Sequence, residues 1–249
     1  MEIVTKRTKF GDRKLAACDK LCGIRELEWK SWMKALCILL LSGFSVSAQS
    51  FQFGIRGGVP LTSYFQTGSV TGMGSITYVS DTKRYTFGPT VELGLPMRLS
   101  VGADLLYKRL DFDETKALIG ATTQSSTTAN SWEVPITARY RLVRSRLVGP
   151  YARAGASFRK LTGVNQDSVV HMVTYPPATS TSSTANPSEL RNTSTIGLVL
   201  GAGLDLKIPL LRLTPELRYT RWRANLFQDS SGLLSSNRDQ VEFLLGITW

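Results

Sequence analysis

Apolar and polar residues alternate with a period of two along much of the chain, most clearly at its end. Residues 240–249 place one apolar set on a single parity, namely Val241, Phe243, Leu245, Ile247 and Trp249. A period of two predicts a β-strand with one apolar face. The segment has about the ten residues that a tilted strand needs to cross a bilayer. By itself it also fits an amphipathic edge strand of a soluble sheet.

The same alternation predicts seven further strands upstream. They are expected at Phe51–Leu61, Arg84–Leu95, Leu99–Lys108, Trp132–Leu142, Pro150–Lys160, Ser194–Lys207 and around Leu213–Thr220. The connections alternate in length: Ser/Thr-rich segments near 62–82, 114–131, 161–193 and 224–239 are long, and those between them are tight turns. We expect the long segments to be irregular loops. Long loops at one end and short turns at the other are typical of β-barrels in outer membranes.

A soluble barrel of the lipocalin type would have the same number of strands but the opposite face inside. The apolar parity here is bulky, whereas the other combines charges with glycines: Gly54, Gly88, Gly94, Gly102, Gly155, Gly197, Gly201 and Gly203. The lumen of an eight-stranded barrel is only just wide enough for its side chains, and glycine weakens a strand without such a reason. We therefore predict an all-β, eight-stranded antiparallel up-and-down transmembrane β-barrel.

Charged residues of both signs lie on the parity predicted to face the lumen. They are Arg56, Glu92, Asp104, Glu133, Arg139, Arg141, Arg153, Asp205, Glu216, Arg218 and Glu242, with Lys108 and Lys207 on the same parity. Buried charges require partners, so we expect a salt-bridged network that plugs the lumen. Its expected core is Glu133, Glu216 and Glu242 facing Arg139, Arg153 and Arg218. A narrow pore for small solutes is the alternative.

Aromatic residues fall at the predicted strand ends. At the loop side lie Tyr85, Tyr107, Trp132 and Tyr219. At the turn side lie Phe51 and Trp249. Aromatic girdles at both membrane interfaces have this placement. The last strand contains Phe243 and ends on Trp249, which predicts a C-terminal signal for the barrel-assembly machinery.

The N-terminal region predicts an export signal rather than a domain. Met33-Lys34 precedes an apolar run up to Val46, and Val46-Ser47-Ala48 has the small-x-small pattern of a cleavage site. Residues 33–48 are therefore expected to be a signal peptide, with the barrel domain at 49–249. Residues 1–32 are expected to be an extension upstream of a true start at Met33, or else a long n-region.

Charge and cysteine content narrow the function classes. The chain carries a formal charge of +11, but the charges occur singly rather than in runs, which argues against a nucleic-acid partner. The cysteines, Cys18, Cys22 and Cys37, all precede residue 48. Cys18 and Cys22 have no second Cys or His pair nearby to complete a metal site. We expect no cofactor and no metal.

Two motifs resemble those of a known family. The strand Glu133-Val134-Pro135-Ile136 through Arg139-Tyr140-Arg141, followed by Gly149-Pro150-Tyr151 through Gly155, resembles the PorT-like outer-membrane β-barrel family. The resemblance implies an eight-stranded barrel in the outer membrane of a Gram-negative bacterium and implies no catalytic residues. A role in secretion, known for some relatives, is not carried by these residues.

Catalysis is not expected, and an outer-membrane barrel enzyme is the less favoured alternative. The one histidine, His171, lies in a predicted loop near Ser168, and a solvated histidine is the simpler interpretation. Asp111, Asp113 and Glu114 are expected to be exposed charges at a loop mouth. We expect a monomeric, non-enzymatic protein with a structural or interaction role through long extracellular loops. Its expected partners are outer-membrane lipid, the barrel-assembly machinery and an unknown extracellular ligand.

Overall fold

The computed structural model describes residues 50–72, 74–143, 147–209 and 211–249. The expected extension and signal peptide lie outside these residues. The strands are β1 (Phe51–Pro60), β2 (Phe65–Thr67), β3 (Ser69–Thr71), β4 (Ser75–Ser80), β5 (Thr86–Gly94), β6 (Leu99–Asp104), β7 (Leu106–Leu118), β8 (Ala121–Arg141), β9 (Val148–Met172), β10 (Ala178–Thr184), β11 (Ser194–Lys207), β12 (Arg212–Trp222), β13 (Leu234–Ser236) and β14 (Asp239–Thr248). Among the described residues, no helix is long and apolar enough to span a membrane.

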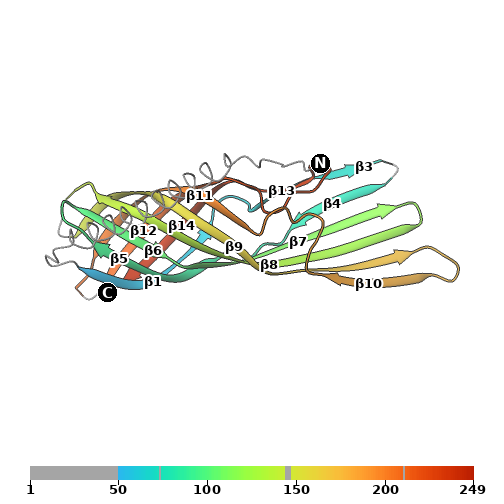
Figure 1. Cartoon of the computed structure of the whole chain (residues 1–249), viewed down its shortest axis with the longest axis horizontal. Helices are drawn as coiled ribbons and strands as arrows, with labels where there is room; N and C mark the ends of the chain where they lie inside the picture. The colour runs from blue at the N-terminus through green and yellow to red at the C-terminus, as the bar shows by residue number, and fades with distance from the viewer. Residues whose placement is uncertain (1–49, 73, 144–146, 210) are drawn as a thin grey trace, which may run out of the picture. The chain divides into compact units, whose positions relative to one another are not determined.

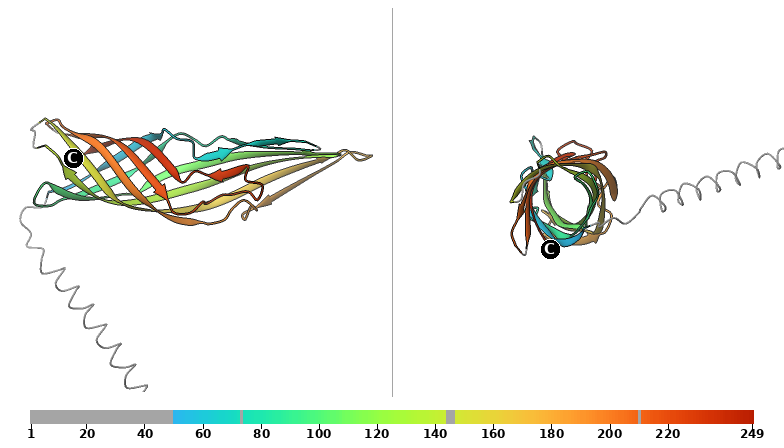
Figure 2. Two further views of the ribbon diagram at one scale, coloured as in Figure 1. Left: turned by 90° about the horizontal axis from the view of Figure 1, so that it is seen from above. Right: turned by 90° about the vertical axis from the view of Figure 1, so that its left-hand side faces the viewer.

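Eight strand positions close into a ring. The order around it is β1, β5, β6, β8, β9, β11, β12 and β14, and β14 pairs back onto β1. The strand β7 continues β6 at the same position of the ring, beside β8. All neighbours are antiparallel. The end-on view of Figure 2 shows the closed ring. The predicted eight-stranded antiparallel up-and-down barrel is therefore confirmed.

The two faces of each strand differ sharply in exposure. On β11, Leu198 is 69% exposed and the next residue, Val199, is 1% exposed. The same alternation places Ile55 and Phe243 outside and the charged Arg56 and Glu242 inside. A soluble protein would bury the apolar set, so this inverted arrangement matches a barrel whose outer face meets lipid.

Three of the four long connections that the sequence pattern predicts as irregular loops consist largely of strand, and only the last, 224–239, is mostly irregular. β7 continues to Leu118 and β8 begins at Ala121, so most of 114–131 is a β-hairpin. β9 likewise continues to Met172 and pairs with β10, which occupies part of 161–193. These strands extend past the closed ring (Figure 1). In this extension β8 and β10 carry Ser and Thr on both faces, so no apolar alternation marks them, although the β-branched threonine suits strands.

An apolar cap lies where the ring ends and the extension begins. We use this name for the buried cluster Tyr64, Phe65, Tyr78, Leu110, Phe112, Ala129, Leu161, Leu226, Phe227 and Leu234. The short strands β2 and β13, from the first and last long connections, pair with each other. The ring of Phe65 lies 5.1 Å from Phe112 and 5.8 Å from Phe227 between centroids. Two segments predicted as loops thus meet and pack together.

Aromatic residues line the outer face near both ends of the ring. Neighbouring rings of Tyr85, Phe87, Tyr107 and Trp132 follow one another at centroid distances of 6.0, 5.6 and 5.2 Å at the loop end. At the turn end, Trp249 packs edge-on against Phe53 at 5.0 Å. Interfacial belts of membrane barrels have this arrangement.

Candidate functional site: the charged barrel interior

The strand alternation brings the predicted lumen residues into the barrel interior. Ten of the eleven residues predicted for the lumen network are at most 6% exposed: Arg56, Glu92, Asp104, Glu133, Arg139, Arg153, Asp205, Glu216, Arg218 and Glu242. Arg141 is less enclosed, with 29% of its side chain exposed. Burial of this many charges is tolerable only where each is paired, and the pairs form three successive groups.

The central group is built around Glu216 on β12. Its carboxylate lies 3.1 Å from Arg56, 3.4 Å from Arg153 and 2.8 Å from Arg218. The hydroxyl of Tyr151 donates a hydrogen bond to it at 2.9 Å. The β11–β9 register places Gly203 opposite Tyr151, and a Cβ at Gly203 would lie only 2.5 Å from that hydroxyl. Glycine at this position therefore makes room for the ring inside the barrel.

Asp104 joins the central group from the opposite wall. Arg56 and Arg218 approach its carboxylate at 3.2 and 2.9 Å, and Thr90 donates a hydrogen bond at 2.6 Å. Because Arg56 and Arg218 contact both carboxylates, they tie β1 and β12 to β6 across the lumen. Charge-assisted bonds of this kind are stronger than neutral ones.

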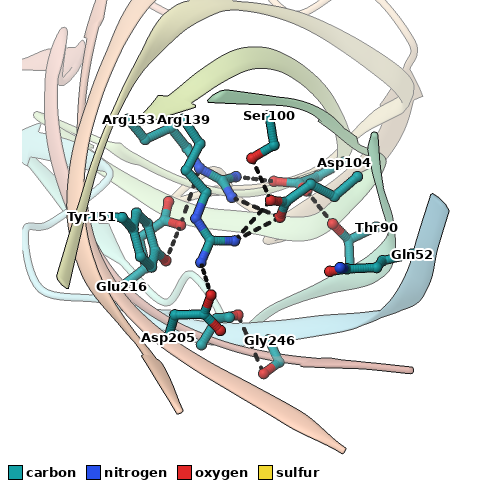
Figure 3. Close-up of polar contacts among 12 residues, drawn as sticks. Gln52, Thr90, Ser100, Asp104, Arg139, Tyr151, Arg153, Asp205, Glu216 and Gly246 are labelled. Atoms are coloured by element: carbon teal, nitrogen blue, oxygen red, sulfur yellow. Dashed lines mark hydrogen bonds and ion pairs between the residues drawn. The ribbon is translucent and has the colours of Figure 1, made fainter. Parts of the chain in front are cut away.

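A second group lies toward the turn end. Glu92 accepts hydrogen bonds from Arg139 at 2.7 Å and from Ser100 at 2.5 Å. Asp205 lies 3.2 Å from Arg139 and 3.0 Å from Arg212. The Arg139 guanidinium also stacks over the Tyr151 ring, 3.7 Å from its centroid. Figure 3 shows Arg139 and Arg153 side by side, with Tyr151 and Glu216 on one side of them and Asp104 on the other.

A third group lies below the apolar cap. Lys108 bridges Glu133, at 2.8 Å, and Glu242. Arg159 contacts Glu133 at 2.6 Å, and its guanidinium stacks 3.6 Å from the Trp222 ring. It also donates a hydrogen bond to the Tyr64 hydroxyl at 2.9 Å, which joins the charged interior to the cap. Burial raises the pKa of Tyr64 to about 12, against the lowering effect of Arg159, so this phenol is neutral at physiological pH.

Some partners differ from those expected. Glu216 meets Arg153 and Arg218 as the sequence suggested, but Glu133 and Glu242 meet Lys108. Arg139 faces Glu92 instead. Parity shows which face a residue occupies, whereas the partner depends on strand tilt and register, which alternation leaves open.

Two arginines of the interior were missing from the predicted network. Arg159 lies on the inward parity of β9 and Arg212 on that of β12, so the same rule would have selected both. Arg159 lies at the end of the strand predicted at Pro150–Lys160, and Arg212 lies between a predicted turn and the strand predicted around Leu213–Thr220. Both carry ion pairs, to Glu133 and to Asp205 respectively.

The other residues considered for chemistry lie apart. Ser168 and His171 are on opposite faces of β9: Ser168 Oγ lies 2.8 Å from Ser125 Oγ, and His171 Nδ1 lies 3.2 Å from Thr179 Oγ1. Glu114 is buried rather than exposed, and Lys116 contacts it at 2.6 Å. Across the described ranges, no group of three or more His, Cys, Asp or Glu residues is arranged to hold a metal ion.

Comparison with known proteins identifies a family. A family model described as outer membrane protein beta-barrel domain matches residues 47–221. No curated protein matches the chain.

Several solved structures are similar to the chain at low identity. Neisserial surface protein A (NspA) is 15% identical with a TM-score of 0.40, and covers 81% of this chain and 98% of its own. OprG from Pseudomonas aeruginosa is 12% identical with a TM-score of 0.47, at 80% and 93% coverage. Ail from Yersinia pestis, in complex with the heparin analogue sucrose octasulfate, is 11% identical with a TM-score of 0.36, at 80% and 99%.

Proposed function

Because the chain belongs to the outer membrane protein β-barrel domain family, we propose that it is a closed, non-conducting barrel that acts through its loop end. In this proposal the barrel anchors and holds up the extension formed by β7–β10 with β3 and β4. The extension meets an extracellular partner, and no reaction is catalysed. The protein works as a monomer in the outer membrane.

One observation carries this proposal: ion-paired side chains fill the middle of the interior, and the apolar cap closes its loop end. The three ion-pair groups occupy the lumen, and the apolar cap covers them at the loop end. Moving an ion past this interior would require separating buried guanidinium–carboxylate pairs, which is costly in a low-dielectric environment. A filled interior leaves the outer surface and the extension as the accessible parts of the molecule.

The finer expectations complete the proposal. Residues 33–48 act as a cleavable signal peptide, and Phe243 and Trp249 act in recognition by the barrel-assembly machinery. Within the outer-membrane barrels, the motifs at Glu133–Arg141 and Gly149–Gly155 favour the PorT-like group. The position of His171 and Ser168 on opposite faces of β9 supports a non-enzymatic role.

Electrical recording in planar lipid bilayers tests this function. Protein purified from outer membranes is reconstituted, and its conductance is recorded in molar salt over a range of voltages. We expect bilayers that contain the protein to show no steady conductance steps. Regular ohmic steps that scale with protein concentration would establish the pore alternative. Heat-modifiable migration on gels, measured on the same sample, shows that the protein was folded.

A further inference from the structure

The turn end of the barrel carries more positive charge than its carboxylates balance. Asp205, whose side chain is 2% exposed, is shared by Arg139 at 3.2 Å, Arg141 at 3.5 Å and Arg212 at 3.0 Å. The other carboxylate of this group, Glu92, is already bound by Arg139. One carboxylate offsets a single charge however many guanidiniums it contacts. This end of the interior therefore keeps a net positive charge.

Strand register adds further cations beside this group. The β11–β12 pairing places Lys207 directly opposite Arg212, and like charges in such positions repel. The backbone N–H of Arg141 donates to the carbonyl of Arg98 at 3.1 Å, which brings those two residues together. Within the described residues, the Lys207 ammonium has no ion pair or hydrogen bond, and the Arg98 guanidinium has one weak contact, to the Leu142 carbonyl at 3.5 Å.

A cavity opens among these cations. Its volume is about 260 Å³, and Arg98, Arg141, Lys207 and Asp205 supply its charged lining. This is far more than the roughly 10–15 Å³ needed to hold one water molecule. Gly149 lies at its wall, where a Cβ would meet nothing closer than 3.6 Å. The cavity therefore has room for a polyatomic anion and its water.

The turn that presents Arg98 is held in an unfavourable backbone conformation. Met97 and Arg98 have φ of 62° and 65°, and Leu99 N–H donates back to the Pro96 carbonyl at 3.4 Å. This is a type I′ turn, for which Asn-Gly is strongly preferred. Strain of this kind is often kept where a side chain has a task. Here the strained residue is the one that places a guanidinium at the cavity.

We propose that the turn-end cavity is a binding site for a phosphate group, held by Arg98, Arg141 and Lys207. Guanidinium groups match the oxygens of phosphate in pairs, and an ammonium adds a compact positive charge. The bound phosphate offsets the repulsion between Lys207 and Arg212. It belongs either to the headgroup of a phospholipid in the leaflet at this end or to a soluble phosphate compound.

Titration calorimetry with inorganic pyrophosphate tests the site. Protein purified from outer membranes in a non-ionic detergent should bind it saturably, and more weakly as salt is added. The double variant R98Q/K207Q should weaken binding at least about tenfold, since each charge-assisted contact is worth about that factor. The matched control is K83Q/R84Q, which removes the same charge from exposed cations at the loop end. It should leave the affinity within about twofold.

A comparison of two ligands and a comparison of further variants complete the test. Tighter binding of short-chain phosphatidylglycerol than of glycerol 3-phosphate assigns the site to lipid, and the reverse order assigns it to a soluble compound. R98G should raise the thermal unfolding midpoint, because glycine relieves the turn, while it weakens binding. Should R98Q/K207Q fail to fold, K207Q alone is compared with K83Q. Absence of saturable binding by the native protein, or equal weakening in the turn-end and loop-end variants, would overturn the proposal.

Discussion

Replacing Glu216 by Gln should destabilise the barrel strongly. The substitution preserves the shape of the side chain but removes a charge that contacts Arg56, Arg153 and Arg218 within 3.4 Å. The Glu216 side chain is fully buried, so the remaining guanidiniums cannot recover solvation. Removing one partner of a buried ion pair costs about 3–5 kcal/mol, and the shared position of Glu216 places the expected loss in the upper part of that range.

Urea unfolding of the barrel in lipid vesicles, followed by tryptophan fluorescence, measures this loss. The unfolding free energy is obtained by linear extrapolation, and an unchanged slope shows that the same transition is compared. D239N is the control: it removes a carboxylate paired with the exposed Arg221, and exposed pairs contribute little.

A double-mutant cycle separates lost attraction from uncompensated charge. E216Q/R218Q removes one charge of each sign, so its loss should be smaller than the sum of the two single losses. An E216Q variant as stable as D239N would show that the interior charges are solvated and that the filled lumen is wrong.

Two further predictions concern the ends of the barrel. F227A should lower the unfolding free energy by about 3–5 kcal/mol, because Phe227 is fully buried in the apolar cap, with its ring 5.4 Å from the Phe112 ring. Urea unfolding measures this loss, and V70A, at an exposed position on a strand, is the control. A loss no larger than that of V70A would argue against a packed cap. Deleting Trp249 removes an edge-on contact with Phe53 that is worth only about 1 kcal/mol of stability. The deletion should nevertheless sharply reduce the yield of protein in the outer membrane, measured by fractionation and immunoblot. An unchanged yield would contradict the role of Trp249 as an assembly signal.

The barrel could be predicted from the sequence because its apolar alternation is strict where strands face lipid. Leu198, Leu200 and Leu204 lie on the outer face of β11, as their parity indicates. The extension escaped prediction because Thr123, Ser125 and Thr127 of β8 are polar like their neighbours, so the period of two is absent there. Their pairing with β9 depends on register between distant segments.

Parity along the strands predicts which residues line the interior, but it does not predict which of them pair. Parity placed Glu216 and Arg218 inside, but Arg218 also reaches Asp104, 114 residues away in sequence. The apolar cap joins Phe65 to Phe227 through the pairing of β2 with β13. No local pattern relates those two segments, because each is too short to show a period.

The central claim is that the apolar face of the barrel meets lipid and that the other face lines a closed interior. Cysteine labelling of two adjacent residues tests this claim most directly. With Cys18, Cys22 and Cys37 replaced by Ser, L198C and V199C each provide a single thiol on β11. A bimane label on L198C should be strongly quenched by brominated lipids, because Leu198 is 69% exposed. V199C should resist labelling in the folded barrel and react only after unfolding, since Val199 is 1% exposed. Quenching at both positions, or ready labelling of V199C in the folded protein, would contradict the account.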